Sequence, residues 1–308
     1  MHLPAYSLHL AAWVGLLGVV AVYAVLIRVP RFAVSKRQAW SFLGAMGVLL
    51  VSLTWPLANL AAHSLLVALV VQRLLLLLAV PPLLFTGLPV GLVAAMTRPS
   101  LLDAVARVCS RPVPAAAIVT AVSVGTLTAP VVSAQASSAY ARGGLDGLLL
   151  LAGCVLWLPV LHPVPGTGSM SALATAGYLV VQSILPSFLS IVWIFARHPL
   201  YAVYAHGRVL FLSPLADQEL SGFVAKLGTI FVLWGVAFVI VVRSERVAEE
   251  GGDPNPLTWA DVERELERAE RRDRHRARVP DASGRSRTFG DAARPDDDPD
   301  GGSSSPSD

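Results

Sequence analysis

The stretch VVQRLLLLLAVPPLLFTGLP, residues 70–89, decides the class of fold. It is almost entirely apolar, yet Gln72 and Arg73 lie among its valines and leucines, and the pair Pro81 and Pro82 follows. A helix of about 20 apolar residues, each adding about 1.5 Å, crosses the roughly 30 Å hydrocarbon core of a bilayer. Arginine keeps its charge in proteins. The stretch therefore predicts a membrane helix with a permanent charge near its middle, which something in the protein must make tolerable.

The composition of the whole chain supports this interpretation. Of its 308 residues, 54% are hydrophobic and only 15% are charged, whereas soluble domains carry about 25% charged residues. Residues 1–242 contain few charges, and residues 243–308 are crowded with Arg, Glu and Asp. This distribution predicts an integral membrane protein with a polar tail. The net charge of +3 is the sum of two unlike parts, so it does not indicate a nucleic acid partner.

Seven stretches are long and apolar enough to span a membrane, and they lack the two-residue alternation of strands. The first has neither a preceding basic region nor a clear cleavage site, so we expect a transmembrane helix there rather than a cleaved signal peptide. The sequence thus predicts an all-α polytopic membrane domain, residues 1–242, with seven transmembrane helices at 5–27, 39–57, 63–86, 113–134, 147–162, 172–196 and 221–242.

Basic residues set the expected orientation. They cluster in loops 28–38 and 97–112 and at the start of the tail, which lie on one side if there are seven spans. By the positive-inside tendency this side is cytoplasmic, so the N-terminus is expected outside and the C-terminus inside. Loops 58–62, 135–146 and 197–220 then face outward.

The polar tail, residues 243–308, is expected to divide in two. Thr258 and Asp261 have the spacing of a helix start, and residues 258–277 then predict a charged cytoplasmic helix. This helix either touches the membrane or a partner, or is simply solvated. Residues 280–308 are rich in Gly, Ser, Pro and Asp and are expected to be disordered.

Gln72 and Arg73 are the first candidate site. A charge near mid-bilayer costs about 2.5–3.5 kcal/mol and marks a functional hypothesis. We expect no carboxylate within any span to pair with Arg73, the nearest candidates being at outer helix ends: Asp146, Asp217 and Glu219. Arg73 therefore either binds a ligand or donates to backbone carbonyls and water. Gln72 can join packed helices, and the proline pair is expected to kink or end its helix.

The second candidate region is the outer loop 197–220. It contains the polar residues Tyr201, Tyr204, Asp217 and Gln218. Histidines suit copper and zinc, so a tentative metal site consists of His63, His198 and His206. The alternative is three interfacial histidines hydrogen-bonded to water. Cys109 and Cys154 match no metal or disulfide spacing.

No catalytic motif is present. The sequence has no phosphate loop, no nucleophile elbow and no HExxH element. We therefore expect a protein that is not an enzyme.

Four landmarks in order carry a family resemblance. They are WPLANLA at 55–61, QRLLLLLAVPPLLFTGLP at 72–89, the Gly-x-x-x-Trp-x-Pro element within 148–161, and PLYAVYA at 199–205 followed by an Asp-Gln-x-x-x-Gly element within 212–222. Together they resemble the CtaG family of cytochrome c oxidase assembly factors, the seven-span bacterial membrane type. The resemblance implies a bacterial inner-membrane protein with cytochrome c oxidase subunits as partners. It also implies help in building a haem–copper oxidase, around copper insertion on the outer side.

This sequence departs from the family pattern at its histidines. The family's third helix usually reads His-Met-x-Gln-His-Leu-Leu, but Leu69 and Arg73 stand where those histidines fall, with Gln72 kept. Thr128-Ala129-Pro130 stands for the family's His-x-Pro. The resemblance thus leaves the cofactor unknown, with copper an open question. It favours a divergent assembly factor that docks oxidase subunits through Asp217, Gln218 and the neighbouring loop.

Two other functions are considered. A transporter of copper or another small solute needs a polar path, for which Gln72, Arg73 and Asn59 are the obvious lining residues. A haem-modifying intramembrane enzyme needs paired mid-span histidines, and the sequence argues against these because its histidines lie near helix ends.

Overall fold

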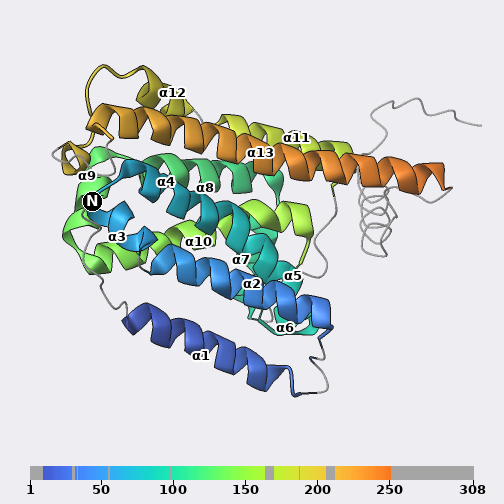
Figure 1. Ribbon diagram of the computed structural model, residues 1–308. Coiled ribbons are helices and arrows are strands. Elements are labelled where there is room, and N and C mark those ends of the chain that lie inside the picture. The colour runs from blue at the N-terminus through green and yellow to red at the C-terminus, as the bar shows by residue number, and fades with distance from the viewer. Residues whose placement is uncertain are drawn as a thin grey trace, which may run out of the picture. The chain divides into compact units, whose positions relative to one another are not determined.

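The structure is a computed structural model that describes residues 10–29, 32, 34–54, 56–96, 99–163, 170–186, 188–205 and 212–250 (Figure 1). These residues all belong to one compact unit, Met1–Leu257. They form helices and connections without a strand, which confirms the all-α prediction. The first helices are α1 (Leu10–Leu26), α2 (Lys36–Leu53), α3 (Leu57–His63), α4 (Leu66–Leu74), a π-helical segment (Leu75–Ala79), α5 (Val80–Gly87), α6 (Val90–Met96) and α7 (Ser100–Cys109). The others are α8 (Pro112–Gly125), α9 (Ala129–Ser137), α10 (Ala139–Leu161), α11 (Ala172–Ile184), α12 (Phe188–Phe195), a 3-10 turn (Ala202–Tyr204) and α13 (Pro214–Glu249).

Five of the helical stretches in the described residues are long and apolar enough to cross a membrane. They are Lys36–His63, Leu66–Gly87, Ala139–Leu161, Ala172–Phe195 and Pro214–Glu249. The pair α7–α8, bent by 89°, makes six if it counts as one crossing, and α1 is a shorter apolar helix. The described residues thus show five or six membrane-capable helices rather than seven. The seven-span topology and its orientation stay predictions.

Two segments predicted as outer loops run into helices, which corrects their bounds. α10 begins at Ala139, where the Ser138 hydroxyl accepts the Ala141 N–H at 3.4 Å. α13 begins at Pro214, where the Ser213 hydroxyl accepts the Ala216 N–H at 3.2 Å. Serine caps and a first-turn proline start helices even among polar residues. The predicted loops 135–146 and 197–220 therefore end in helix.

These helix starts overturn another expectation. Asp146 lies inside α10, within a membrane-capable helix, and Asp217 lies in the first turn of α13. The prediction that no carboxylate lies within a span is therefore wrong. α13 also passes the predicted domain boundary at residue 242 without a break. The predicted tail elements 258–277 and 280–308 lie outside the described residues.

The proline pair does not end its helix, because a π-helical segment precedes it. The Val80 N–H bonds to the Leu75 carbonyl, five residues back, and α5 continues to Gly87. Pro81 has no N–H to offer to the Leu77 carbonyl, four residues back. The Trp157 indole N–H of α10 donates to that carbonyl instead, at 3.1 Å.

The fit of α10 against this segment explains part of the Gly-x-x-x-Trp-x-Pro element. A Cβ on Gly153 would lie 2.8 Å from the Leu76 carbonyl oxygen and 2.9 Å from the Leu77 Cα. Only glycine permits that approach, and it brings Trp157, one turn later, onto the open carbonyl. The motif is thus a packing device for the π-helical segment.

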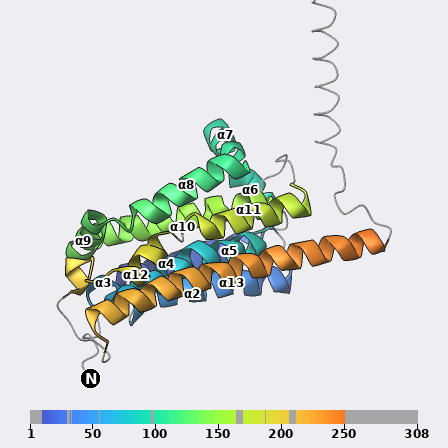
Figure 2. The same ribbon diagram turned by 90° about the horizontal axis from the view of Figure 1, so that it is seen from above.

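The continuous stretch α4–π–α5 lies between α10 and α13, as Figures 1 and 2 both show. Gln72 and Arg73 are therefore central in the bundle. One end of the bundle, here called the α9 end, gathers the α3–α4 junction, α9 and the start of α13 (left in Figure 1). The segments predicted to face outward meet there, and their assignment to the outer side stays a prediction.

Candidate functional site

Arg73 is the centre of a buried polar cluster. Its side chain is 4% exposed. Its Nη1 donates to Thr126 Oγ1 at 2.8 Å, and its Nη2 donates to the Thr126 carbonyl at 2.9 Å and to Gln135 Oε1 at 3.1 Å. Thr126 follows the last residue of α8. The guanidinium therefore meets the negative end of that helix dipole, which stabilises a cation.

Gln72 links this cluster to α10. Its Nε2 donates to Asp146 Oδ2 at 3.3 Å, and both side chains are buried. Asp146 thus places a negative charge near Arg73 without a direct bond to it. The cluster is incompletely satisfied, because Gln72 Oε1 and Arg73 Nε have no hydrogen-bond partner in the structure. Donation to a backbone carbonyl, one of the two interpretations of Arg73, is observed, and the free Nε keeps ligand binding open to test.

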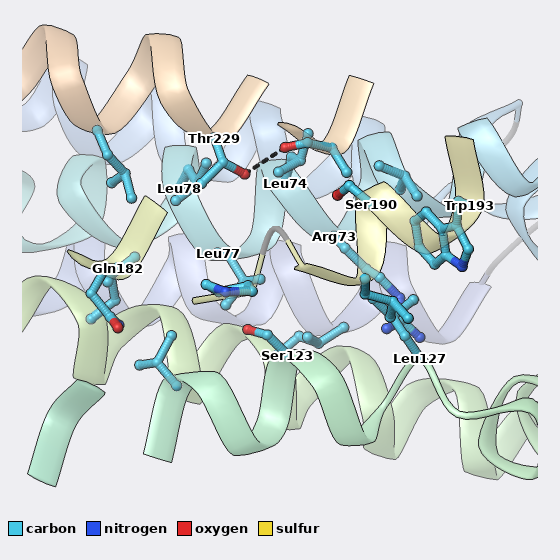
Figure 3. Close-up of a pocket in the computed structure, with 18 residues that line it drawn as sticks. Arg73, Leu74, Leu77, Leu78, Ser123, Leu127, Gln182, Ser190, Trp193 and Thr229 are labelled. Atoms are coloured by element: carbon cyan, nitrogen blue, oxygen red, sulfur yellow. Dashed lines mark hydrogen bonds between the residues drawn. The ribbon is translucent and has the colours of Figure 1, made fainter. Parts of the chain in front are cut away.

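A cavity adjoins Arg73. Its empty space amounts to about 740 Å³ when the gaps between atoms and the open surroundings are counted, so the enclosed part is much smaller. Figure 3 shows the polar residues Arg73, Ser123, Gln182, Ser190 and Thr229 around it, with Leu74, Leu77 and Leu78 between Arg73 and Gln182. The remaining lining is mainly apolar. The Gln182 side chain is 1% exposed, and its amide oxygen has no hydrogen-bond partner.

Tyr201 and Tyr204 fix the connection between α12 and α13. The Tyr201 hydroxyl donates to the Leu127 carbonyl at 2.6 Å and accepts the Trp193 indole N–H at 3.2 Å. The Tyr204 hydroxyl donates to the Ala61 carbonyl. Burial raises the pKa of both hydroxyls, so they stay protonated as these bonds require. The two tyrosines tie the connection to the neighbouring helices.

Asp217 is buried and binds the start of another helix. It is 3% exposed, and its carboxylate accepts the Leu66 N–H at 2.6 Å and the Val67 N–H at 3.1 Å. These are the first two N–H groups of α4, whose own preceding residue, Leu65, has no side chain able to cap. An aspartate from α13 therefore caps α4 across the bundle, where the helix dipole favours negative charge.

Gln218, predicted with Asp217 as a docking residue, is also turned inward. It is 2% exposed, its Oε1 accepts the Leu200 N–H at 2.7 Å, and its Nε2 donates to the Trp193 carbonyl at 3.4 Å. One turn further, a Cβ on Gly222 would lie 2.8 Å from the Ser190 carbonyl oxygen. The Asp-Gln-x-x-x-Gly element therefore caps α4, holds the connection and allows α12 to approach α13.

The residues that these contacts leave outside are Arg197, His198, Pro199 and Leu200, all exposed. We call them the exposed segment. It lies between α12 and the two anchoring tyrosines. Its backbone is held at Leu200 by Gln218.

The predicted histidine site is only partly described. His63 is exposed, and its Nε2 lies 3.4 Å from Arg142 Nη2. His198 is exposed, and His206 lies outside the described residues. Within the part of the chain that the structure describes, no three His, Cys, Asp or Glu side chains form a group that could hold a metal ion. The neighbouring Arg142 also makes His63 a less favourable place for a metal cation.

Sequence reasoning found Gln72, Arg73, Tyr201 and Tyr204 and named Asp146 as a candidate partner of Arg73, but it missed Thr126 and Gln135. Thr126 lies inside the predicted span 113–134, and Gln135 begins the predicted loop 135–146. Gln182 carried a usable signal, since it is an amide inside the predicted span 172–196. Gln72 was selected because it is an amide in an apolar span, and the same reasoning would have selected Gln182.

Comparison with known proteins identifies the family. No curated protein and no solved structure gives a significant match. The family model described as cytochrome c oxidase caa3 assembly factor (Caa3_CtaG) matches residues 17–246, well over half of the chain. The matched range contains the Arg73 cluster, the cavity and the exposed segment. The chain therefore belongs to the Caa3_CtaG family of cytochrome c oxidase caa3 assembly factors.

Proposed function

We propose that this protein acts in a bacterial inner membrane as a non-catalytic factor that docks a subunit of the caa3 oxidase during assembly. The contact lies at the α9 end, through the exposed segment Arg197, His198, Pro199 and Leu200. One observation carries the proposal. The segment is exposed, yet buried and partly buried hydrogen bonds hold its last residue and the chain directly after it.

Such an arrangement lowers the cost of binding. A free loop loses conformational entropy when a partner orders it, whereas a loop that is already held loses less. Gln218 holds the Leu200 N–H, and the Tyr201 and Tyr204 hydroxyls hold the carbonyls of Leu127 and Ala61. In this proposal Asp217 and Gln218 are positioning residues. They act on the oxidase through the segment that α13 holds in place.

The proposal is tested by co-purification of oxidase subunits with the full-length tagged protein from its own membranes. The double substitution Arg197→Glu and Leu200→Asp reverses a charge and removes an apolar contact without touching a buried bond. We expect recovery of oxidase subunits to fall about tenfold, the effect of losing one good contact of about 1.4 kcal/mol. Arg243→Glu, at an exposed position far along α13, is the matched control. Unchanged recovery from the double variant would sink the docking role.

Asp217→Ala tests the positioning role in the same assay. We expect it to lower the recovery of oxidase subunits indirectly, because the start of α13 and the connection that it holds become less firmly fixed. The thermal stability of the protein should fall as well. Recovery that is unchanged while stability falls would remove Asp217 from the docking mechanism.

Copper insertion is the finer form of this proposal, and a deletion strain separates it from docking alone. Membranes are assayed for oxidase activity and for the reduced-minus-oxidised a-type haem spectrum, with and without added copper. Loss of both signals with rescue by copper supports copper insertion. Loss that copper does not restore supports docking alone, and an unchanged oxidase contradicts both.

A second candidate, transport of copper or another small solute, is favoured by one arrangement. Arg73 lines the cavity described above, and Asp146 lines another with about 990 Å³ of empty space between α10, α2 and α1. Gln72, which precedes Arg73 in the sequence, donates to Asp146. Uptake by vesicles containing the purified protein tests this function, and uptake equal to that of empty vesicles removes it.

A further inference from the structure

The cavity beside Arg73 has features that the docking role does not use. Its wall combines a cation, an unpartnered amide and a long apolar face. Arg73 uses Nη1 and Nη2 within the protein, and its Nε is left without a partner in a 4% exposed side chain. A buried donor without a partner costs about 1–3 kcal/mol. An acceptor inside the cavity would recover that cost.

The charge of Arg73 favours an anionic acceptor. Within the described residues, the one ion pair within 4.0 Å joins Arg107 and Asp103, so Arg73 has no carboxylate in direct contact. Asp146 bonds to Gln72 and not to Arg73. Carboxylates are among the acceptors that guanidinium groups bind most strongly. The polar end of the cavity thus fits a carboxylate head.

The rest of the cavity fits an alkyl chain. Leu74, Leu77 and Leu78 follow Arg73 along one side, and Val119 and Leu156 face the same space from α8 and α10. Figure 3 shows the leucines between the positions of Arg73 and Gln182. Concave sites with an apolar wall and a few convergent polar groups are typical small-molecule sites.

Gln182 gives a second, independent sign that the cavity holds something. Its amide oxygen lacks a hydrogen-bond partner. The amide lies beside the oxygen of the Tyr178 hydroxyl, whose proton goes to the Leu156 carbonyl at 3.0 Å. An amide left like this in an empty apolar space is costly. An oxygen atom in the cavity, from a ligand or from water that accompanies it, would satisfy Gln182.

We propose that this cavity binds a long-chain carboxylate, with the anionic head at Arg73 Nε and the chain along Leu74, Leu77 and Leu78. The site is separate from the exposed segment and does not depend on docking of the oxidase. The carboxylate would come from a free fatty acid. A phospholipid offers a similar chain with a different head group, and the experiment distinguishes the two.

Trp193 provides the readout, because it lines the cavity and is 1% exposed. Bromine atoms on an alkyl chain quench indole fluorescence on contact. The full-length protein in nanodiscs is titrated with dibromostearic acid, with its methyl ester, and in discs that contain brominated phosphatidylcholine. The protein has seven tryptophans, so the Trp193→Phe variant is measured in parallel to isolate the Trp193 contribution.

We expect saturable quenching of Trp193 by the acid, with an apparent affinity about tenfold higher than that of the ester. Arg73→Gln should remove this preference while leaving quenching of the other tryptophans unchanged. If Arg73→Gln does not fold, the comparison of acid with ester on the unaltered protein decides alone. Equal quenching by acid and ester, no quenching of Trp193, or equal quenching by the brominated phospholipid would overturn the proposal.

Discussion

The two buried polar clusters of the bundle differ in how fully their groups are used. At the α9 end, both oxygens of Asp217 accept backbone N–H groups, and both amide atoms of Gln218 are bonded. In the middle of the bundle, the cluster of Arg73 and Gln72 keeps one donor and one acceptor without a partner. The two clusters are otherwise alike in burial.

The difference separates structural from functional burial. A polar group that is fully bonded inside a protein stabilises one arrangement of helices and has nothing left to offer a ligand. A group that keeps an unused donor is a cost to the fold, and such costs are often retained where something binds. Substitutions at the two clusters should therefore act differently on stability.

The largest effect is expected at Asp217. Asp217→Ala leaves the Leu66 and Val67 N–H groups unpaired inside the bundle and removes the charge from the start of α4. We expect a loss of about 3 kcal/mol in the free energy of unfolding, since each unpaired buried donor costs about 1–3 kcal/mol. Thermal unfolding in detergent measures it, with the exposed Glu245→Ala on the same helix as the control. A melting temperature equal to that of the control would show that Asp217 does not cap α4.

A smaller effect is expected at Arg73. Arg73→Leu removes three hydrogen bonds, but it also removes the cost of keeping a charge out of water. We expect a loss of about 2 kcal/mol, less than at Asp217. Arg73→Lys should recover only part of it, because an ammonium group cannot bond Thr126 and Gln135 as a planar fork does. A loss at Arg73 greater than at Asp217, in the same unfolding assay, would reverse the comparison.

The sequence predicted the class of fold because apolar length is a local property. It placed helices over most of the predicted spans, and it singled out Arg73 because a charge in an apolar run is visible without a structure. It placed Asp146 and Asp217 at helix ends but did not show that both are buried. Their burial depends on Gln72 and on the N–H groups of Leu66 and Val67, which are distant in the sequence.

The proline pair is another case in which a partner distant in the sequence decides the local structure. Pro81 was expected to break its helix, since it cannot donate to the Leu77 carbonyl. The break is avoided by a donor that lies 80 positions away, the Trp157 indole. No local pattern reveals that such a donor is available.

Trp157 gives the third prediction. Trp157→Phe keeps most of the ring but removes the N–H that serves the Leu77 carbonyl beside Pro81. We expect a loss of about 1 kcal/mol from that one bond. Trp40→Phe is the matched control, because Trp40 is 74% exposed. Equal melting temperatures for the two variants would mean that another donor satisfies the Leu77 carbonyl. The position of the Arg73 cluster would then depend less on the packing of α10.

The smallest effect has the opposite sign and sharpens the comparison most. Gln182→Leu replaces an amide whose oxygen has no partner by an apolar side chain of similar size. Since the desolvation cost of the amide disappears, we expect the empty protein to gain about 1 kcal/mol in unfolding free energy. Gln218→Leu is the matched control and should lose stability, because that amide makes two bonds. The same substitution thus moves the melting temperature up at the cavity and down at the α9 end. A loss at both positions would show that the Gln182 amide has a partner in the folded protein, and the cavity would then no longer differ from the rest of the buried polar interior.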